Sequence, residues 1–426
     1  MRRLGFGLIA VLTASLAAAE DVDWKQGLEE AIARALAQNP SIAEMDTRVR
    51  AAGHRAGQAL ALPDPEVEVE IQDIPPSDFS FSRDDFTMEK ITARQRFPSA
   101  GKRPAQKRSA EAEQQSLSAM HADHIVRLAA QVGDAFFTIA EIDSRTAILE
   151  RSRERLRRVA ESAAERYRVG KGAQPDVLRA NLEITAIDEK LAGLRGDRRV
   201  ATARWNALQA LPATTSVAPL GLPETDPIVP GITELLGEAS DLSPMVKAAQ
   251  ANLRRAQEQA TLARLERRPE FMAKAYYAHR VDFEDLVGAG VSLNLPFFQP
   301  KRLKELEAER EAELSGARAG LEMVKYQIQG GVEEAFAELE RSVEQARLYR
   351  GSILPQAETN AAAAQEAYTV GQIDFLTYVR AALDRDQYEG ELAMRRAGAW
   401  RAIAALQMAS GLPLLPGTPK TGGSHE

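Results

Sequence analysis

The sequence contains no cysteine among its 426 residues. This absence excludes disulfide frameworks, thiolate metal sites, cysteine nucleophiles and a lipid-modified N-terminal cysteine. Charged residues make up 27% of the chain, which does not fit a disordered or collagen-like protein. Because acidic residues outnumber basic ones and the formal net charge is −7, nucleic acid is an unsuitable partner.

Long apolar runs are also absent from most of the chain. Beyond the N-terminal segment, no stretch approaches 18 uninterrupted apolar residues, so no transmembrane helix is expected there. At the N-terminus, Arg2 and Arg3 precede an apolar run over residues 4–16 and three alanines. This pattern predicts a cleavable secretory signal over residues 1–19. The alternative is a membrane anchor, which requires roughly 20 apolar residues.

Catalytic motifs are missing as well. No glycine-rich phosphate loop follows a predicted strand, and no histidine–acid–nucleophile group stands out. We therefore expect neither an enzyme nor a cofactor.

What the sequence does contain is an internal duplication. "YRVGKGAQPDVL" starts at Tyr167, and "YTVGQIDFL" starts at Tyr368. Further matches lie along the whole chain: Pro40 with Pro244, Pro65 with Pro269, Gly101-Lys102-Arg103 with Pro300-Lys301-Arg302, and Ala207-Leu208-Gln209 with Ala405-Leu406-Gln407. These matches predict one repeat over 20–210, a linker with five prolines over 211–230, a second repeat over 231–413 and a flexible tail over 414–426.

Each copy predicts the same elements: a helix, a β-hairpin, a very long helix, a tight turn and a returning helix. Alternation of period two predicts strands over 66–72, 86–97, 270–279 and 286–296. Residues 104–167 contain a single glycine after Pro104 and keep a seven-residue apolar spacing, which predicts a long coiled-coil helix. In the second copy we expect Pro355 to kink the corresponding helix.

Four strands set a requirement for assembly. They cannot close a membrane barrel alone, and open edges in lipid cost several kcal/mol for each unpaired group. If the strands enter a membrane, two or more chains must share them, and three chains give twelve. Glu66, Glu68 and Glu70 would then face a wet lumen while the alternating apolar side chains face lipid. The alternative is a half-buried sheet packed on helices.

In this duplicated plan, the chain resembles the TolC-type outer-membrane factor family over nearly its whole mature length. "LPDPEVEVEIQ" and "RQRFPSAGKR" resemble most the branch that exports heavy-metal cations. The resemblance implies a mainly α fold with a membrane β-barrel, in which three chains form a twelve-stranded barrel continued by a periplasmic α-barrel. It also implies an outer-membrane location, a homotrimer, a periplasmic adaptor and an inner-membrane RND pump as partners.

The resemblance assigns roles to both turns. It implies adaptor docking at Tyr167, Val169, Gly170, Tyr368, Val370 and Gly371, and a periplasmic gate at Asp176 and Asp374. The alternative for the tyrosines and valines is that they only pack the turn. The alternative for the aspartates is that each one stabilises the start of a helix, where an acid is favoured by roughly 0.3–1 kcal/mol.

Two further features carry weaker signals. His121 and His124 lie on one predicted helical face, but a histidine pair without a third ligand is more typical of an exposed polar helix than of a metal site. For the cargo, heavy-metal cations are the first hypothesis. Drug or solvent efflux and type I secretion are the alternatives, and a periplasmic adaptor or coiled-coil scaffold is the remaining one.

Overall fold

The computed structural model describes residues 24–420. Within them the protein is mainly helical with four antiparallel strands, and it divides into two compact units. Unit 1 takes in residues up to Glu44, Ala122–Pro244 and the chain from Lys325 onward, and unit 2 takes in Met45–His121 and Met245–Val324. Each unit therefore combines parts of both predicted repeats. The predicted signal over 1–19 lies outside the described residues.

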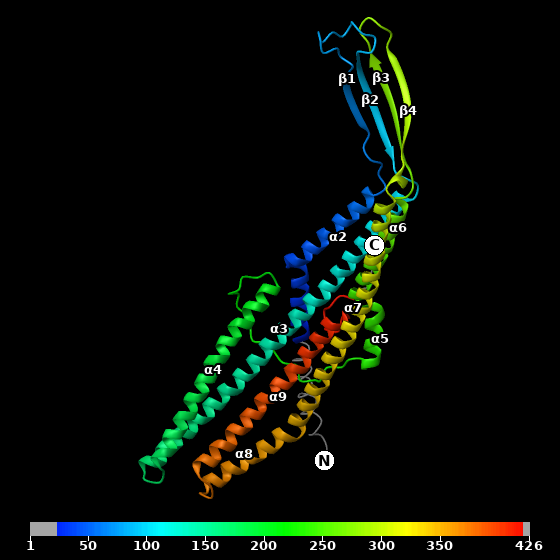
Figure 1. Ribbon diagram of the computed structural model, residues 1–426. Helices are drawn as coiled ribbons and strands as arrows, with labels where there is room; N and C mark the ends of the chain where they lie inside the picture. The colour runs from blue at the N-terminus through cyan, green and yellow to red at the C-terminus, as the bar shows by residue number, and fades with distance from the viewer. Residues whose placement is uncertain (1–23, 421–426) are drawn as a thin grey trace, which may run out of the picture. The chain divides into compact units, whose positions relative to one another are not determined.

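Unit 2 contains the sheet. Its strands are β1 (Glu66–Gln72), β2 (Met88–Phe97), β3 (Glu270–His279) and β4 (Leu286–Asn294). They lie side by side in chain order, and every neighbouring pair is antiparallel (Figure 1). The alternation of apolar and polar residues predicted β1 and β3 with these bounds, and β2 and β4 differ from their predicted ranges at one end each.

Proline determines where the flanking helices begin. α2 (Pro40–Gln58) and α6 (Pro244–Leu265) both start at a proline, whose missing N–H costs nothing in the first turn. Both end before the next proline, and the residue directly ahead of a proline disfavours the helical conformation, so neither helix continues up to it.

The start of α3 is fixed to the second repeat within unit 2. Lys102 is 7% exposed, and its Nζ lies 2.8 Å from a Glu266 carboxylate oxygen and 2.6 Å from one of Glu270. Further along the same helix, Arg108 forms an ion pair with Glu258 at 2.8 Å.

The long helices are α3 (Lys102–Arg168) and α7 (Pro300–Leu348), with a short 3-10 turn η1 (Pro296–Phe298) before α7. In unit 1, α3 is followed by α4 (Gln174–Leu208). The second copy continues through a π-helical segment η2 (Tyr349–Ile353), α8 (Leu354–Thr369) and α9 (Phe375–Ser410), and α5 (Ile232–Leu242) follows the linker.

The π-helical segment lies where a kink was expected. Pro355 has no N–H, and in a regular helix its ring would clash with the carbonyl of Gly351, four residues earlier. η2 places a wider turn across that position, and α8 then resumes at Leu354. The expected irregularity is therefore a π-turn ahead of the proline.

Two apolar clusters lie in the interior of unit 1. One is aromatic: Phe137 lies 5.3 Å from Phe136, 5.5 Å from Trp400 and 5.9 Å from Trp24 between ring centroids. The other joins α3, α4 and α9 close to the helical turns. Its buried residues are Leu156, Ala160, Ala163, Ala180, Ile187, Leu191, Phe375 and Val379.

The end of the described chain is packed. Leu415 is 3% exposed, and the N–H groups of Leu414 and Leu415 donate to the side-chain oxygen of Gln407 at 2.9 and 2.8 Å. The tail from residue 414 was expected to be flexible, but Gln407 binds Leu414, Leu415 and Thr418 of this segment to α9. Within residues 24–420, no helix combines the length and the apolar character that crossing a membrane requires.

Candidate functional site

The turns after α3 and α8 have the same backbone. Gly170 and Gly371 take left-handed φ values of 71° and 78°. Four hydrogen bonds define two matching Schellman caps: Gly170 N–H to Tyr167 O at 3.0 Å, Lys171 N–H to Arg166 O at 2.8 Å, Gly371 N–H to Tyr368 O at 3.1 Å, and Gln372 N–H to Ala367 O at 2.8 Å. The repeated Tyr-x-Val-Gly motif therefore encodes one turn geometry twice.

Glycine is required in these turns for its backbone freedom. No heavy atom lies within 4 Å of the position that a Cβ would take at Gly170 or Gly371. A substitution there meets open space, so its cost comes from the left-handed backbone alone.

The side chains around the two turns differ in exposure. Val169 and Val370 are 66% and 68% exposed, and Tyr167 is 48% exposed. Tyr368 instead stacks on Tyr378 with ring centroids 5.3 Å apart. Three of these side chains are thus exposed, whereas Tyr368 packs the turn.

A cation also holds the tyrosine of the second turn. The Arg166 guanidinium lies 4.9 Å from the Tyr368 ring centroid, which is a cation–π distance. Because Arg166 lies at the end of α3 and Tyr368 at the end of α8, this contact links the first turn to the second.

The two predicted gate aspartates occupy different positions in their helices. Asp374 is the N-cap of α9, and its Oδ1 accepts a hydrogen bond from the Thr377 N–H at 2.7 Å. Hydrogen bonding from the Thr377 side chain, together with this backbone bond, lowers the pKa of Asp374 below its usual value. Asp176 lies inside the first turn of α4, behind Ala173 as the N-cap, which makes no side-chain cap bond. A gate built on these residues would draw on acids at non-equivalent positions.

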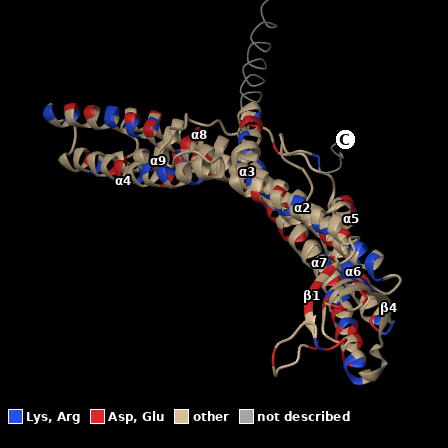
Figure 2. Cartoon of the chain, turned by 90° about the horizontal axis from the view of Figure 1, so that it is seen from above, with Lys and Arg blue, Asp and Glu red and all other residues tan. Residues whose placement is uncertain are grey.

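Charge near the turns is balanced. Both α4 and α9 carry basic and acidic side chains along their length (Figure 2). The buried Asp386 on α9 forms ion pairs with Arg155 of α3 and with its neighbour Arg385, the latter at 2.6 Å. The arginine-rich part of α3 therefore pairs with acids of its own chain.

The sheet separates apolar from polar side chains. On one face, Val67, Val69 and Ile71 are 69%, 72% and 56% exposed, and Val287 and Val291 are 81% and 69% exposed. The pairing register continues this face across all four strands, with Val69 opposite Ile91, Ile91 opposite Tyr277 and Tyr277 opposite Val287. We call this surface the apolar face.

The opposite, polar face carries the three glutamates of β1. The neighbouring strand supplies their partners: Lys90 Nζ lies 2.7 Å from Glu70, and Arg94 pairs with Glu68. Strand alternation places Arg96 and Lys274 on the same face. Although β1 alone is acidic, the polar face of the whole sheet is not.

The two histidines of the 121–124 pair are not brought together around an ion. His124 Nε2 lies 2.7 Å from Ser41 Oγ, within unit 1. Among the residues that the structure describes, no three histidine, aspartate or glutamate side chains are grouped to hold a metal.

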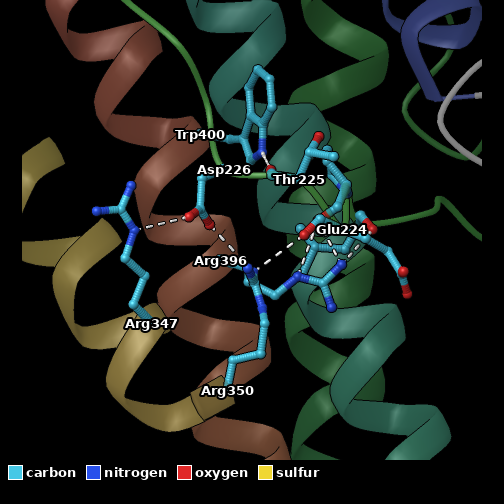
Figure 3. A network of polar contacts seen from close by, with 9 residues as sticks. Glu224, Thr225, Asp226, Arg347, Arg350, Arg396 and Trp400 are labelled. Atoms are coloured by element: carbon cyan, nitrogen blue, oxygen red, sulfur yellow. Dashed lines mark hydrogen bonds and ion pairs between the residues drawn. The ribbon is translucent and has the colours of Figure 1, made fainter.

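Side chains of the helices hold the linker between the repeats. The sequence did not predict this contact. Figure 3 shows the carbonyls of successive linker residues facing arginines and a tryptophan. The contacts are Arg396 to Leu222 O at 3.1 Å and Pro223 O at 3.0 Å, Arg350 to Glu224 O at 3.2 Å, Trp400 Nε1 to Thr225 O at 3.3 Å, and Arg347 and Arg350 to Asp226 at 3.2 and 3.3 Å.

A signal for this contact was present in the duplication. Arg198 of α4 donates to the carbonyls of Val217 and Ala218 at 3.1 and 3.4 Å. Arg198 and Arg396 are separated by the same interval as the two Ala-Leu-Gln motifs. Equivalent arginines of the two repeats thus hold the two halves of the linker.

Comparisons with known proteins give a consistent result. The profile of a family described as outer membrane efflux protein matches residues 31–211 and 235–412. A search of curated proteins finds no match.

Solved structures show the same fold. The outer-membrane channel OprN is 18% identical with a TM-score of 0.77, covering 90% of this chain and 89% of its own. VceC, an outer membrane protein of Vibrio cholerae, is 17% identical with a TM-score of 0.76, covering 91% and 98%. The MtrE outer membrane channel of Neisseria gonorrhoeae is 16% identical with a TM-score of 0.75, covering 92% and 91%.

Proposed function

The chain belongs to the outer membrane efflux protein family, and from this premise we propose that it is the outer-membrane exit duct of a tripartite efflux system. In this role it conducts substrate passively from an inner-membrane RND pump and a periplasmic adaptor to the outside. An N-terminal signal over residues 1–19 would direct its export.

The observation that carries the proposal is the sheet of unit 2. Its apolar face is exposed along every strand, and its edge strands β1 and β4 have no partner on their outer sides within the described residues. Lipid is the environment that favours such a face. Lipid also requires the edges to be paired, because an unpaired backbone group there costs several kcal/mol. We therefore infer a homotrimer whose twelve strands close into a barrel.

The test of this step is the assembly state. Protein expressed in a Gram-negative host and extracted from the outer membrane should require detergent and give a trimer by native mass spectrometry. A stable monomer without detergent would refute the duct.

For the adaptor, the two matched turns offer the docking surface. Three chains would present six turns of one geometry, each with a valine that is about two-thirds exposed. Docking at these turns is tested by cross-linking to an adaptor and is developed in the Discussion.

For the cargo, we propose heavy-metal cations, supported by the resemblance of the first hairpin region to the metal-exporting branch. The balanced charge of the polar face gives this proposal no electrostatic support. Deleting the protein in its native host should therefore lower tolerance to divalent or monovalent metals. If metal tolerance stays unchanged while drug or solvent tolerance falls, the duct serves organic compounds instead.

A further inference from the structure

The polar face of the sheet is nearly bare along one strand. From position 288 onward, the polar-face residues of β4 are small: Gly288, Gly290, Ser292 and Asn294. In β2, the second strand of the first hairpin, those between positions 90 and 96 are mostly long: Lys90, Thr92, Arg94 and Arg96. Glycine is depleted in strands, and inside one it often marks a place where another group approaches closely. The two glycines of β4 therefore point to close neighbours on this face.

The side chain of Tyr276 fills the space above Gly288. The two residues lie directly opposite each other in the pairing of β3 with β4. A Cβ added at Gly288 would come within 2.5 Å of Cε1, Cζ and the hydroxyl oxygen of Tyr276. Because these atoms are the far end of the side chain, the ring lies across β4 instead of standing away from the sheet. A side chain at position 288 is incompatible with this position of the ring.

The strand on the other side of Tyr276 is crowded at the same level. The residue opposite Tyr276 on β2 is Thr92, which is β-branched and 2% exposed. Lys90 Nζ lies 5.3 Å from the centroid of the Tyr276 ring, which is a cation–π distance, and 2.7 Å from Glu70. The ring therefore lies over β4, where glycine leaves room for it.

The next glycine along β4 has a neighbour that can move. Gly290 lies opposite Lys274, and a Cβ added at Gly290 would lie 3.1 Å from Lys274 Cε. This atom belongs to the flexible end of an exposed side chain, which can rotate away from an added methyl group. Two glycines on one face of one strand thus differ in a single respect: the first lies under a rigid ring and the second under a flexible chain.

We propose that Gly288 is a positioning residue that keeps the Tyr276 ring flat against the wall of the duct, so that this pair sets the width of the lumen at its level. The inference rests on the proposed function, because the polar face lines a lumen only when the strands close into a barrel. Three chains place three such rings at one level, and each ring would extend toward the axis if it could not lie over β4. The pair thereby keeps this level open to bulky solutes.

The width at this level is tested by access from outside the cell, for which a chain without cysteine is a clean background. Asn294→Cys places a thiol at an exposed polar-face position at the helical end of β4. Position 288 is closer than position 294 to the turn between β3 and β4, so a reagent entering from outside passes the level of Tyr276 first. Membrane-impermeant maleimides of increasing size, from a small sulfonated one to polyethylene-glycol conjugates, are added to intact cells.

The expected result depends on the size of the reagent. Gly288→Ala should slow labelling of the Asn294→Cys thiol several-fold for the largest maleimide that labels the protein with Asn294→Cys alone, and should leave the smallest unaffected. The matched control, Gly290→Ala, adds the same methyl group and should leave all rates unchanged, because Lys274 moves aside. Gly288→Ala combined with Tyr276→Ala should restore labelling by the large reagent, because no ring remains to be raised.

The possible results separate the inference from the proposed function. If Gly288→Ala is labelled like the protein with Asn294→Cys alone at every size, if Gly290→Ala slows labelling equally, or if Tyr276→Ala restores nothing, the inference is wrong and the duct stands. If native mass spectrometry finds no trimer of Gly288→Ala, with or without Tyr276→Ala, the glycine serves assembly instead of the width, and the inference is refuted. If no reagent labels Asn294→Cys alone from outside, the polar face lines no open lumen and the proposed duct fails as well.

Discussion

The second helical turn offers a substitution whose cost can be worked out from the structure. In Gly371→Ala, the added methyl group meets open space, so the change affects only a backbone with φ of 78°. A left-handed conformation costs a residue with a Cβ roughly 1–2 kcal/mol. This cost is enough to raise the population of opened forms of the Schellman cap several-fold. It is small compared with the stability of a large assembly.

The control is the same substitution in a regular helix. Gly390 lies inside α9, and no heavy atom lies within 4 Å of the position that an added methyl group would take there. Because alanine is favoured over glycine in a helix by about 0.5–1 kcal/mol, Gly390→Ala should stabilise the chain. The two variants add one methyl group each and have opposite expected signs.

Four measurements test this substitution. Hydrogen exchange at the Gln372 amide, which donates to the Ala367 carbonyl at 2.8 Å, should become faster in Gly371→Ala and stay unchanged in Gly390→Ala. Trimer yield should be normal in both. Adaptor cross-linking and efflux should fall only in Gly371→Ala, because the exposed Val370 beside the cap is displaced. Faster exchange at Gln372 with normal cross-linking and efflux would show that the glycine only ends a helix, and the docking role would be wrong.

Three other predictions follow from individual side chains. Arg396→Ala removes the hydrogen bonds to Leu222 and Pro223, so it should cost about 1–3 kcal/mol in unfolding free energy and make proteolysis of the linker faster. The control is Arg395→Ala, which loses only a pair with Glu391 on its own helix. Equal rates of linker proteolysis in the two variants would contradict the role of Arg396 in holding the linker. Burial lowers the pKa of Lys102, but the hydrogen bonds and charges of Glu266 and Glu270 outweigh burial and raise the pKa above its ordinary value. The charged lysine therefore stabilises the fold below about pH 10, and this stabilisation is lost as pH rises through the folded pKa. Thermal unfolding at neutral and strongly alkaline pH should therefore differ more for the native protein than for Lys102→Met, and equal pH dependence of the two would overturn the assignment. Hydrogen bonds from the side chain and the N–H of Thr377 lower the pKa of Asp374, so the stability that this cap contributes is present above the ordinary carboxylate pKa and is lost as pH falls through the folded value. Asp374→Asn should therefore flatten the acid limb of an unfolding profile, whereas Asp176→Asn, without a cap bond, should be the weaker change.

Local features of the protein could be predicted from its sequence because they depend on residues close together in the chain. The alternation in residues 66–72 and 270–279 gave the two strands, since side-chain direction in a strand follows from backbone geometry alone. The glycines at 170 and 371 predicted helix ends, because few residues other than glycine take the left-handed turn at no cost. The duplication predicted that both turns would share one geometry.

The tertiary structure decided which residues at matching positions of the two repeats have the same surroundings. Tyr167 and Tyr368 occupy the same position in their motifs, but only Tyr368 lies against Tyr378, so one is exposed and the other packed. The glutamates of β1 are an acidic pattern in the sequence, yet Lys90 and Arg94 arrive from the next strand and offset them. Arg396 meets linker carbonyls more than 170 residues away in the chain. In each case the partner comes from a remote segment, and the spacing of residues within one segment contains no information about which remote segment will lie beside it.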